Sequence, residues 1–161
     1  MQSNSSKSDM WPDKVATLIE SLPYMKQYSG LSVVIKFGGH AMGEQASIEA
    51  FASDIVLLQQ VGAKPVVVHG GGPQIGSMLA RLEMESNFID GLRVTDQQTI
   101  SIVEMVLAGA INKSLVTSIS AAGGMSVGIS GKDGNLIIAK KLNHRTKDTD
   151  SAIENLVDLG Y

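Results

Sequence analysis

The chain has 161 residues, of which 43% are hydrophobic and 18% are charged, so wholesale disorder is excluded. Its formal net charge is −3, and no segment concentrates positive charge. Both facts argue against general binding to nucleic acid or to a membrane surface. There is no cysteine, the three histidines form no metal-binding pair, and no apolar run approaches the ~20 residues that span a bilayer. We therefore predict a soluble, cytoplasmic protein without a metal site.

The start of the chain divides into two predicted segments. Residues 1–12 are Ser-rich and polar, carry no secretory signal, and are predicted to form a disordered lead. Residues 13–30 are predicted to form a helix, which Pro23 kinks because its ring removes an amide donor and clashes with the preceding turn. The apolar side chains of this helix form a stripe that needs burial, and one option is packing against its own domain. The stripe consists of Val15, Leu18, Ile19, Leu22 and Met25.

Two strand–glycine–helix units follow in succession. Ser32–Phe37 is almost continuously apolar, which is typical of a strand buried on both faces, and Gly38-Gly39 ends it. A helix with one apolar face then leads to a strand at 65–69, to Gly70–Gly72, and to a helix that begins at Pro73. This repeated order predicts an α/β fold, with a parallel sheet covered by helices.

The architecture changes after these two units. A short hairpin is expected around an Asp90-Gly91 turn, and a long helix from Thr95 or Asp96 to about Ala122. The remaining predictions are strands at 125–130 and 136–140, a polar loop at 143–150, and a last apolar stripe at 152–159.

Lys36 is the first candidate for chemistry, because it lies within an apolar strand next to a diglycine. Burying an unpaired ammonium is costly, so we expect it at the carboxyl edge of the sheet, where open α/β sheets bind their ligands. There it would meet an anion. The alternative is an edge-strand lysine whose charge reaches solvent.

The two glycine clusters, Gly38-Gly39 and Gly70–Gly72, each join a strand end to a helix start. Their amides can approach an anion closely, and a helix N-terminus adds a favourable dipole. Two clusters after consecutive strands favour a phosphate or carboxylate site over glycines that only supply turns. Neither GxxxxGK[ST] nor GxGxxG is completed, which disfavours a P-loop enzyme and a dinucleotide-binding domain.

Arg93 lies just beyond the predicted hairpin turn, where its planar guanidinium suits bidentate capture of a carboxylate. The alternative is a surface arginine paired with Asp96 or Glu85. His69 precedes the triglycine, but no carboxylate or nucleophile lies at a telling spacing, so we interpret it as structural.

Four motifs together resemble the acetylglutamate kinases of the amino acid kinase family. They are Val34–Gly39, Val68–Pro73, Gly91–Thr95 and Gly131–Asp133, in that order. The resemblance implies a three-layer αβα sandwich with a mainly parallel open sheet. It also implies ATP-dependent phosphorylation of the side-chain carboxylate of N-acetyl-L-glutamate, a step of arginine biosynthesis. The alternatives are a carbamate- or aspartate-type kinase, and a non-catalytic module that binds small anions.

The resemblance also assigns roles to residues. Lys36 would stabilise the transition state, the amides of Gly38, Gly39, Gly71 and Gly72 would hold the phosphoryl group and the substrate, and Arg93 would clamp the α-carboxylate. Family members continue into a nucleotide-binding domain whose lysine, aspartate and asparagine map onto no residue here. Residues 31–161 would thus form the N-terminal amino-acid-binding domain, inactive by itself, with ATP and Mg²⁺ bound mainly by the missing C-terminal domain.

The N-terminal helix has a counterpart in arginine-inhibited members of that family. There a kinked helix interlaces dimers into a hexamer, and Leu22-Pro23-Tyr24 is similar to its kink. The resemblance therefore implies a homo-oligomer, L-arginine as a feedback inhibitor, and an effector and oligomer role for Leu22 and Tyr24.

Overall fold

The computed structural model describes residues 11–140, 143–147 and 154–158. Most of the predicted lead, residues 1–10, lies outside the described residues. Trp11 and Pro12 were predicted to end the lead, but they form part of the first turn of helix α1 (Trp11–Tyr28).

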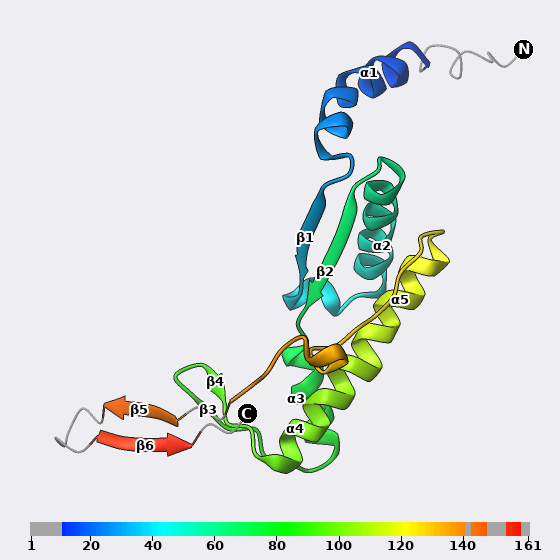
Figure 1. Cartoon of the computed structure of the whole chain (residues 1–161). Coiled ribbons are helices and arrows are strands. Elements are labelled where there is room, and N and C mark those ends of the chain that lie inside the picture. Colours follow the sequence, from blue (N-terminus) through cyan, green and yellow to red (C-terminus); the bar gives the residue numbers. More distant parts are fainter. Residues whose placement is uncertain (1–10, 141–142, 148–153, 159–161) are drawn as a thin grey trace, which may run out of the picture.

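Helix α1 carries Pro23 in its interior, as the sequence predicted, and ends before Gly30, whose φ is +81°. Figure 1 shows the helix bending along its length and lying beyond the end of the sheet, away from the other helices. Most of its apolar stripe is exposed, with Leu18 59% and Ile19 61% accessible, while Met25 is partly buried. Packing of this stripe against its own domain is therefore not what the structure shows.

The central sheet is formed by two parallel strands, β1 (Ser32–Phe37) and β2 (Lys64–His69). Helix α2 (Gln45–Gln60) connects them and covers one face together with α5 (Asn112–Ala121). Ala52 and Ile55 of α2 pack there with Ile119 of α5. This arrangement confirms the α/β class and the parallel sheet.

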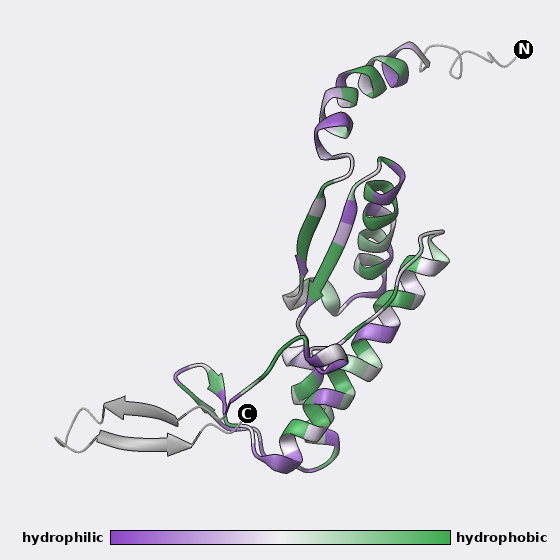
Figure 2. Cartoon of the chain, viewed as in Figure 1, coloured by the Kyte–Doolittle hydropathy of each residue, from purple (hydrophilic) through white to green (hydrophobic). Residues whose placement is uncertain are grey.

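The opposite face of the sheet is uncovered, contrary to the prediction that the first strand is buried on both faces. Val34 is 70% exposed, and Val66 and Val68 are about half exposed. The reason is topological, because α2 and α5 lie on the same side of the two strands and nothing among the described residues covers the other. Figure 2 shows hydrophobic residues along both strands.

A second group of elements follows the sheet. Helix α3 (Gly72–Arg81) begins directly after β2, and strands β3 (Phe88–Ile89) and β4 (Leu92–Arg93) form the predicted antiparallel hairpin. Asp90 and Gly91 both have positive φ at its turn, as a tight two-residue hairpin requires.

The predicted long helix is present but is not uniform. It comprises α4 (Gln97–Glu104), a π-helical segment η2 (Met105–Ile111) and α5. Asp96 caps it, because its carboxylate accepts a hydrogen bond of 2.7 Å from the amide of Thr99. By length and composition alone the stretch Gln97–Ala121 could cross a membrane, but Val106, Ile111, Leu115 and Ile119 on it are core residues.

The main core lies beneath the carboxyl ends of the strands. It joins the end of β1, the 3₁₀ turn η1 (Gly39–Met42), α3, η2 and α5. Leu79 is fully buried at its centre. The buried residues of this cluster are Phe37, Met42, Ile75, Leu79, Val106, Ile111 and Leu115.

Three predictions for the C-terminal part are wrong. Residues 125–130 and 136–140 are extended or irregular and form no strand, with the short 3₁₀ turn η3 (Asp133–Asn135) between them. The predicted polar loop contains strand β5 (Asn143–Lys147), which pairs antiparallel with β6 (Glu154–Asp158) in the last apolar stripe. β-Structure requires a partner strand, which local sequence does not reveal.

Candidate functional site

The two glycine turns meet at one edge of the sheet. Phe37 lies beside His69 in the parallel register, so both strands end at the same level. The amide of Gly70 donates a hydrogen bond of 3.2 Å to the carbonyl of Phe37, which joins one turn to the other. A Cβ added at Gly38 would lie 3.8 Å from the Gly70 nitrogen. The predicted convergence of the glycine clusters is therefore confirmed.

Helix α3 presents its N-terminus at this edge. The first amides of a helix have no partner within it and, with the helix dipole, favour an anion. Gly72 and Pro73 open the helix, and a Cβ at Gly72 would meet nothing within 4 Å. The space in front of this turn is open to a ligand.

Gly71 has a packing role that the sequence did not predict. A Cβ there would lie 2.4 Å from Cδ1 of Ile111 and 2.8 Å from Cδ2 of Leu107. Both side chains come from the π-helical segment η2, which presses against the back of the turn. Position 71 therefore has no room for a side chain, because the turn packs directly against η2.

Lys36 projects from the uncovered side of the sheet, opposite Val68 in the register. Its side chain is exposed and makes no hydrogen bond or ion pair within the described part of the chain. The alternative of a lysine reaching solvent fits this exposure. Lys36 lies two residues before Gly38, at the carboxyl end of β1, where the two glycine turns join.

Arg93 reaches back from the hairpin to the triglycine turn. Its Nη2 donates to the carbonyl of Gly72 at 3.4 Å, its Nη1 donates to the hydroxyl of Ser86, and its guanidinium lies 4.6 Å from the ring centre of Phe88. Within the described residues it forms no ion pair with Asp96 or Glu85. The structure thus brings Arg93 to the glycine site, where no carboxylate of the described residues pairs with its charge.

His69 connects elements, as expected from the sequence. Its Nδ1 lies 3.1 Å from the carbonyl of Gly70, and its Nε2 lies 3.4 Å from Nδ2 of Asn112. Asn112 also donates to the carbonyl of Ile129, and its neighbour Lys113 donates to that of Gly128. Sequence reasoning missed Asn112, since a single asparagine in a long helix gives no signal.

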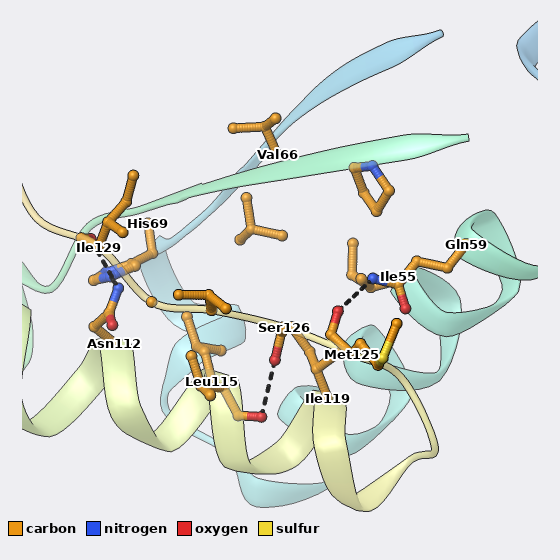
Figure 3. Close-up of a pocket in the computed structure, with 15 residues that line it drawn as sticks. Ile55, Gln59, Val66, His69, Asn112, Leu115, Ile119, Met125, Ser126 and Ile129 are labelled. Carbon is orange, nitrogen blue, oxygen red and sulfur yellow. Dashed lines mark hydrogen bonds between the residues drawn. The ribbon is translucent and has the colours of Figure 1, made fainter. Parts of the chain in front are cut away.

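A cavity of about 330 Å³ lies behind the site, between β2 and the extended segment 125–129. Figure 3 shows its wall of apolar side chains, with Leu115 and Ile119 below the strand. Gln59 donates to the carbonyl of Met125 at its far end. Of the predicted site residues, none lines this cavity.

The remaining candidate residues lie elsewhere. Leu22 and Tyr24 are exposed on α1, at the opposite end of the sheet from the glycine turns. In the motif Gly131–Asp133, Asp133 accepts a hydrogen bond from the amide of Ser130, which lowers the pKa of its carboxyl. Among the described residues no cluster of histidine or carboxylate side chains could hold a metal ion. The site therefore offers donors and cations, suited to phosphate and carboxylate groups.

Comparison with known proteins decides the family. The model of the amino acid kinase family matches residues 32–161, which include every element of the glycine site. The chain belongs to the amino acid kinase family. This confirms the resemblance seen in the sequence motifs.

Curated members of the amino acid kinase family with high similarity are named acetylglutamate kinase. The chain is 59% identical to that of Rhodospirillum rubrum over 151 residues and 53% identical to that of Rhizorhabdus wittichii over 161 residues. These alignments cover 94% and 100% of this chain, but 49% and 54% of the relatives. The chain thus spans about half the length of the curated relatives it matches.

A solved structure has a related fold. The N-acetylglutamate synthase of Neisseria gonorrhoeae, complexed with coenzyme A and N-acetyl-glutamate, matches with a TM-score of 0.57 and 27% identity. The match covers 67% of this chain and 25% of the synthase.

Proposed function

We propose that this chain is the substrate-binding half of an acetylglutamate kinase. The observation that carries the proposal is that two glycine turns join at one sheet edge, with Arg93 bonded to the second turn and Lys36 two residues before the first. The names of the curated relatives support the choice of reaction. The reaction transfers the γ-phosphoryl group of ATP to the side-chain carboxylate of N-acetyl-L-glutamate and gives an acyl phosphate in arginine biosynthesis.

The proposed roles follow from the chemistry of phosphoryl transfer, which depends on positioning and charge stabilisation. The Lys36 ammonium would neutralise charge on the transferred phosphoryl group. The amides at Gly38-Gly39 and at Gly71-Gly72 would orient the phosphoryl group and the reacting carboxylate. Arg93, already held near Gly72, would bind the α-carboxylate through its two nitrogens.

The described residues fit the phosphoryl group better than the metal that accompanies ATP. They supply amides and an ammonium at the site, and no carboxylate cluster. Because the chain spans about half the length of its curated relatives, we assign ATP and Mg²⁺ mainly to a C-terminal domain corresponding to their other half, where Mg²⁺ would neutralise phosphate charge. The division into a helix at 13–30 and an amino-acid-binding domain at 31–161 belongs to the same proposal.

The role of Lys36 is tested by Lys36→Ala in a complete kinase containing this chain. A charge that acts only in the transition state contributes on the order of 10²–10³ in rate. We expect kcat to fall by that factor, far more than KM rises. Near-normal turnover would remove Lys36 from the mechanism.

The role of Arg93 is tested by Arg93→Lys in the same enzyme. An ammonium cannot reproduce the bidentate fork, so affinity for N-acetyl-L-glutamate should fall while that for ATP stays unchanged. Equal weakening of both ligands would contradict the assignment.

The chain alone separates the proposal from a non-catalytic anion-binding module. We expect N-acetyl-L-glutamate to raise its melting temperature more than ATP does, and no acyl phosphate to form. Stabilisation by many small anions alike would favour the module. Stabilisation by aspartate or carbamoyl compounds would favour another amino acid kinase.

We further propose that α1 joins dimers of the cytoplasmic enzyme into a hexamer that L-arginine inhibits, with Leu22 and Tyr24 at the shared surface. Support comes from the exposed stripe, which no other part of the described chain covers. Deleting residues 1–28 should leave dimers and blunt inhibition by arginine while sparing catalysis. Light scattering that shows one and the same oligomer before and after deletion would refute this.

A further inference from the structure

One side chain connects the two glycine turns. Gln74 is the third residue of α3, directly behind the triglycine turn. Its carboxamide Nε2 donates a hydrogen bond of 3.2 Å to the carbonyl of Met42, the last residue of η1, which begins at Gly39. Residues 32 positions apart in the sequence are thereby linked across the front of the core.

The other end of the same carboxamide has no partner. Oε1 of Gln74 is buried and accepts no hydrogen bond from the described residues. It lies against the triglycine turn, 3.9 Å from the point where a Cβ at Gly71 would be. A buried acceptor without a donor costs free energy, which offsets at least part of what the hydrogen bond to the Met42 carbonyl contributes. Stability alone is therefore a weak reason for glutamine here.

The reason for a glutamine at position 74 lies in the hydrogen bond that its Nε2 donates to the Met42 carbonyl. Apart from the packing of the Met42 side chain in the main core, the turn after β1 is joined to the turn after β2 by the backbone bond from Gly70 to Phe37, at the base of the two strands. The Gln74 bond acts farther out, at the end of η1. A hydrogen bond is directional, so this second bond fixes the orientation of the Met42 carbonyl and of the η1 backbone.

We propose that Gln74 is a positioning residue, which holds the Gly38-Gly39 turn at the spacing that the anion site requires. This rests on the proposed function, since the group to be positioned is the one that binds the carboxylate and the phosphoryl group. Gln74 acts through Met42 and contacts no reacting atom.

The test uses Gln74→Met in the 161-residue chain, because methionine has similar length and no donor. Hydrogen exchange should become faster at the amides of residues 39–42 and stay unchanged in β1 and β2. Affinity for N-acetyl-L-glutamate, measured by calorimetry, should fall roughly five- to tenfold, the effect of one neutral hydrogen bond. The matched control is Gln60→Met, on the exposed end of α2. It should change neither the exchange at residues 39–42 nor the affinity for N-acetyl-L-glutamate.

A second variant distinguishes positioning from packing. In Gln74→Glu the ionised carboxyl cannot donate to the Met42 carbonyl, but the protonated carboxyl can. Protection of residues 39–42, corrected for intrinsic exchange rates, should therefore be low at pH 7 and recover as the pH falls toward 5, because burial raises the pKa of a carboxyl. A packing role predicts no such recovery.

The outcomes separate the two proposals. If exchange at residues 39–42 is unchanged in Gln74→Met, the positioning role is wrong, whatever the ligand does. If exchange accelerates but the unmodified chain binds no N-acetyl-L-glutamate, the link between the turns is upheld, and the proposed substrate and the role of Gln74 toward it are both refuted.

Discussion

The contact between Gly71 and the π-helical segment predicts a defined penalty for Gly71→Ala. The new methyl would lie 2.4 Å from Cδ1 of Ile111 and 2.8 Å from Cδ2 of Leu107, whereas carbon atoms pack at ~3.5–4.0 Å. Ile111 is only 8% exposed and belongs to the main core, so it cannot move without disturbing its neighbours. Overpacking of this kind costs about 1–3 kcal/mol. For a chain of this size, a loss of about 2 kcal/mol lowers the melting temperature by roughly 4–8 °C.

Thermal unfolding followed by circular dichroism measures this penalty, and two further variants identify its cause. Gly72→Ala is the control, because a Cβ there meets nothing within 4 Å, and its melting temperature should change little. Ile111→Val removes the methyl that clashes, at a cost of about 0.5–1.5 kcal/mol by itself. The double variant Gly71→Ala/Ile111→Val should lose less unfolding free energy than the two single variants together, by at least ~0.5 kcal/mol. Strict additivity, or an unchanged melting temperature for Gly71→Ala, would refute the close contact.

Three other changes test the frame around the site. The hydrogen bond from Thr99 lowers the pKa of Asp96, so the ionised cap stabilises the helix above the unfolded pKa of ~3.9 and loses this effect as the pH falls through the lower folded value. Asp96→Ala should lower the melting temperature at pH 7, and its difference from the unmodified chain should shrink on acidification, whereas a constant difference would contradict the role of charge. Gly128→Ala would place a Cβ 1.8 Å from Oδ1 of Asn112, and we expect a loss of about 1–3 kcal/mol and faster hydrogen exchange at residues 125–130. Leu79→Ala in the main core should cost about 2–5 kcal/mol in urea unfolding, and a loss below ~1 kcal/mol would show that the core is not packed there.

The elements around the site could be predicted because their signals are local. The apolar run before Gly38-Gly39, the proline after the triglycine turn and the Asp90-Gly91 turn each act within a few residues. Lys36 and Arg93 stood out because a cation in an apolar strand and one after a tight turn both need an explanation. The structure places Arg93 and the glycines together, whereas Lys36 has no hydrogen bond or ion pair with the residues that the structure describes.

The errors arose where the structure depends on distant partners. The apolar runs at 125–130 and 136–140 have the composition of strands but no partner strand among the described residues, whereas the polar run Asn143–Lys147 has one in β6. The π-helical segment is likewise invisible in a helical pattern. Gln74 gave no signal, because glutamine is ordinary in the first turn of a helix and its importance lies in a carbonyl far along the chain.

The uncovered face of β1 and β2 has a consequence for the life of the polypeptide after synthesis. Val34, Val66 and Val68 form an apolar surface on two strands that pair with each other and with no third strand among the described residues. Such surfaces attract chaperones and proteases, and they drive aggregation at micromolar concentration. A polypeptide that covers this face would therefore lengthen the time for which the chain persists in a cell.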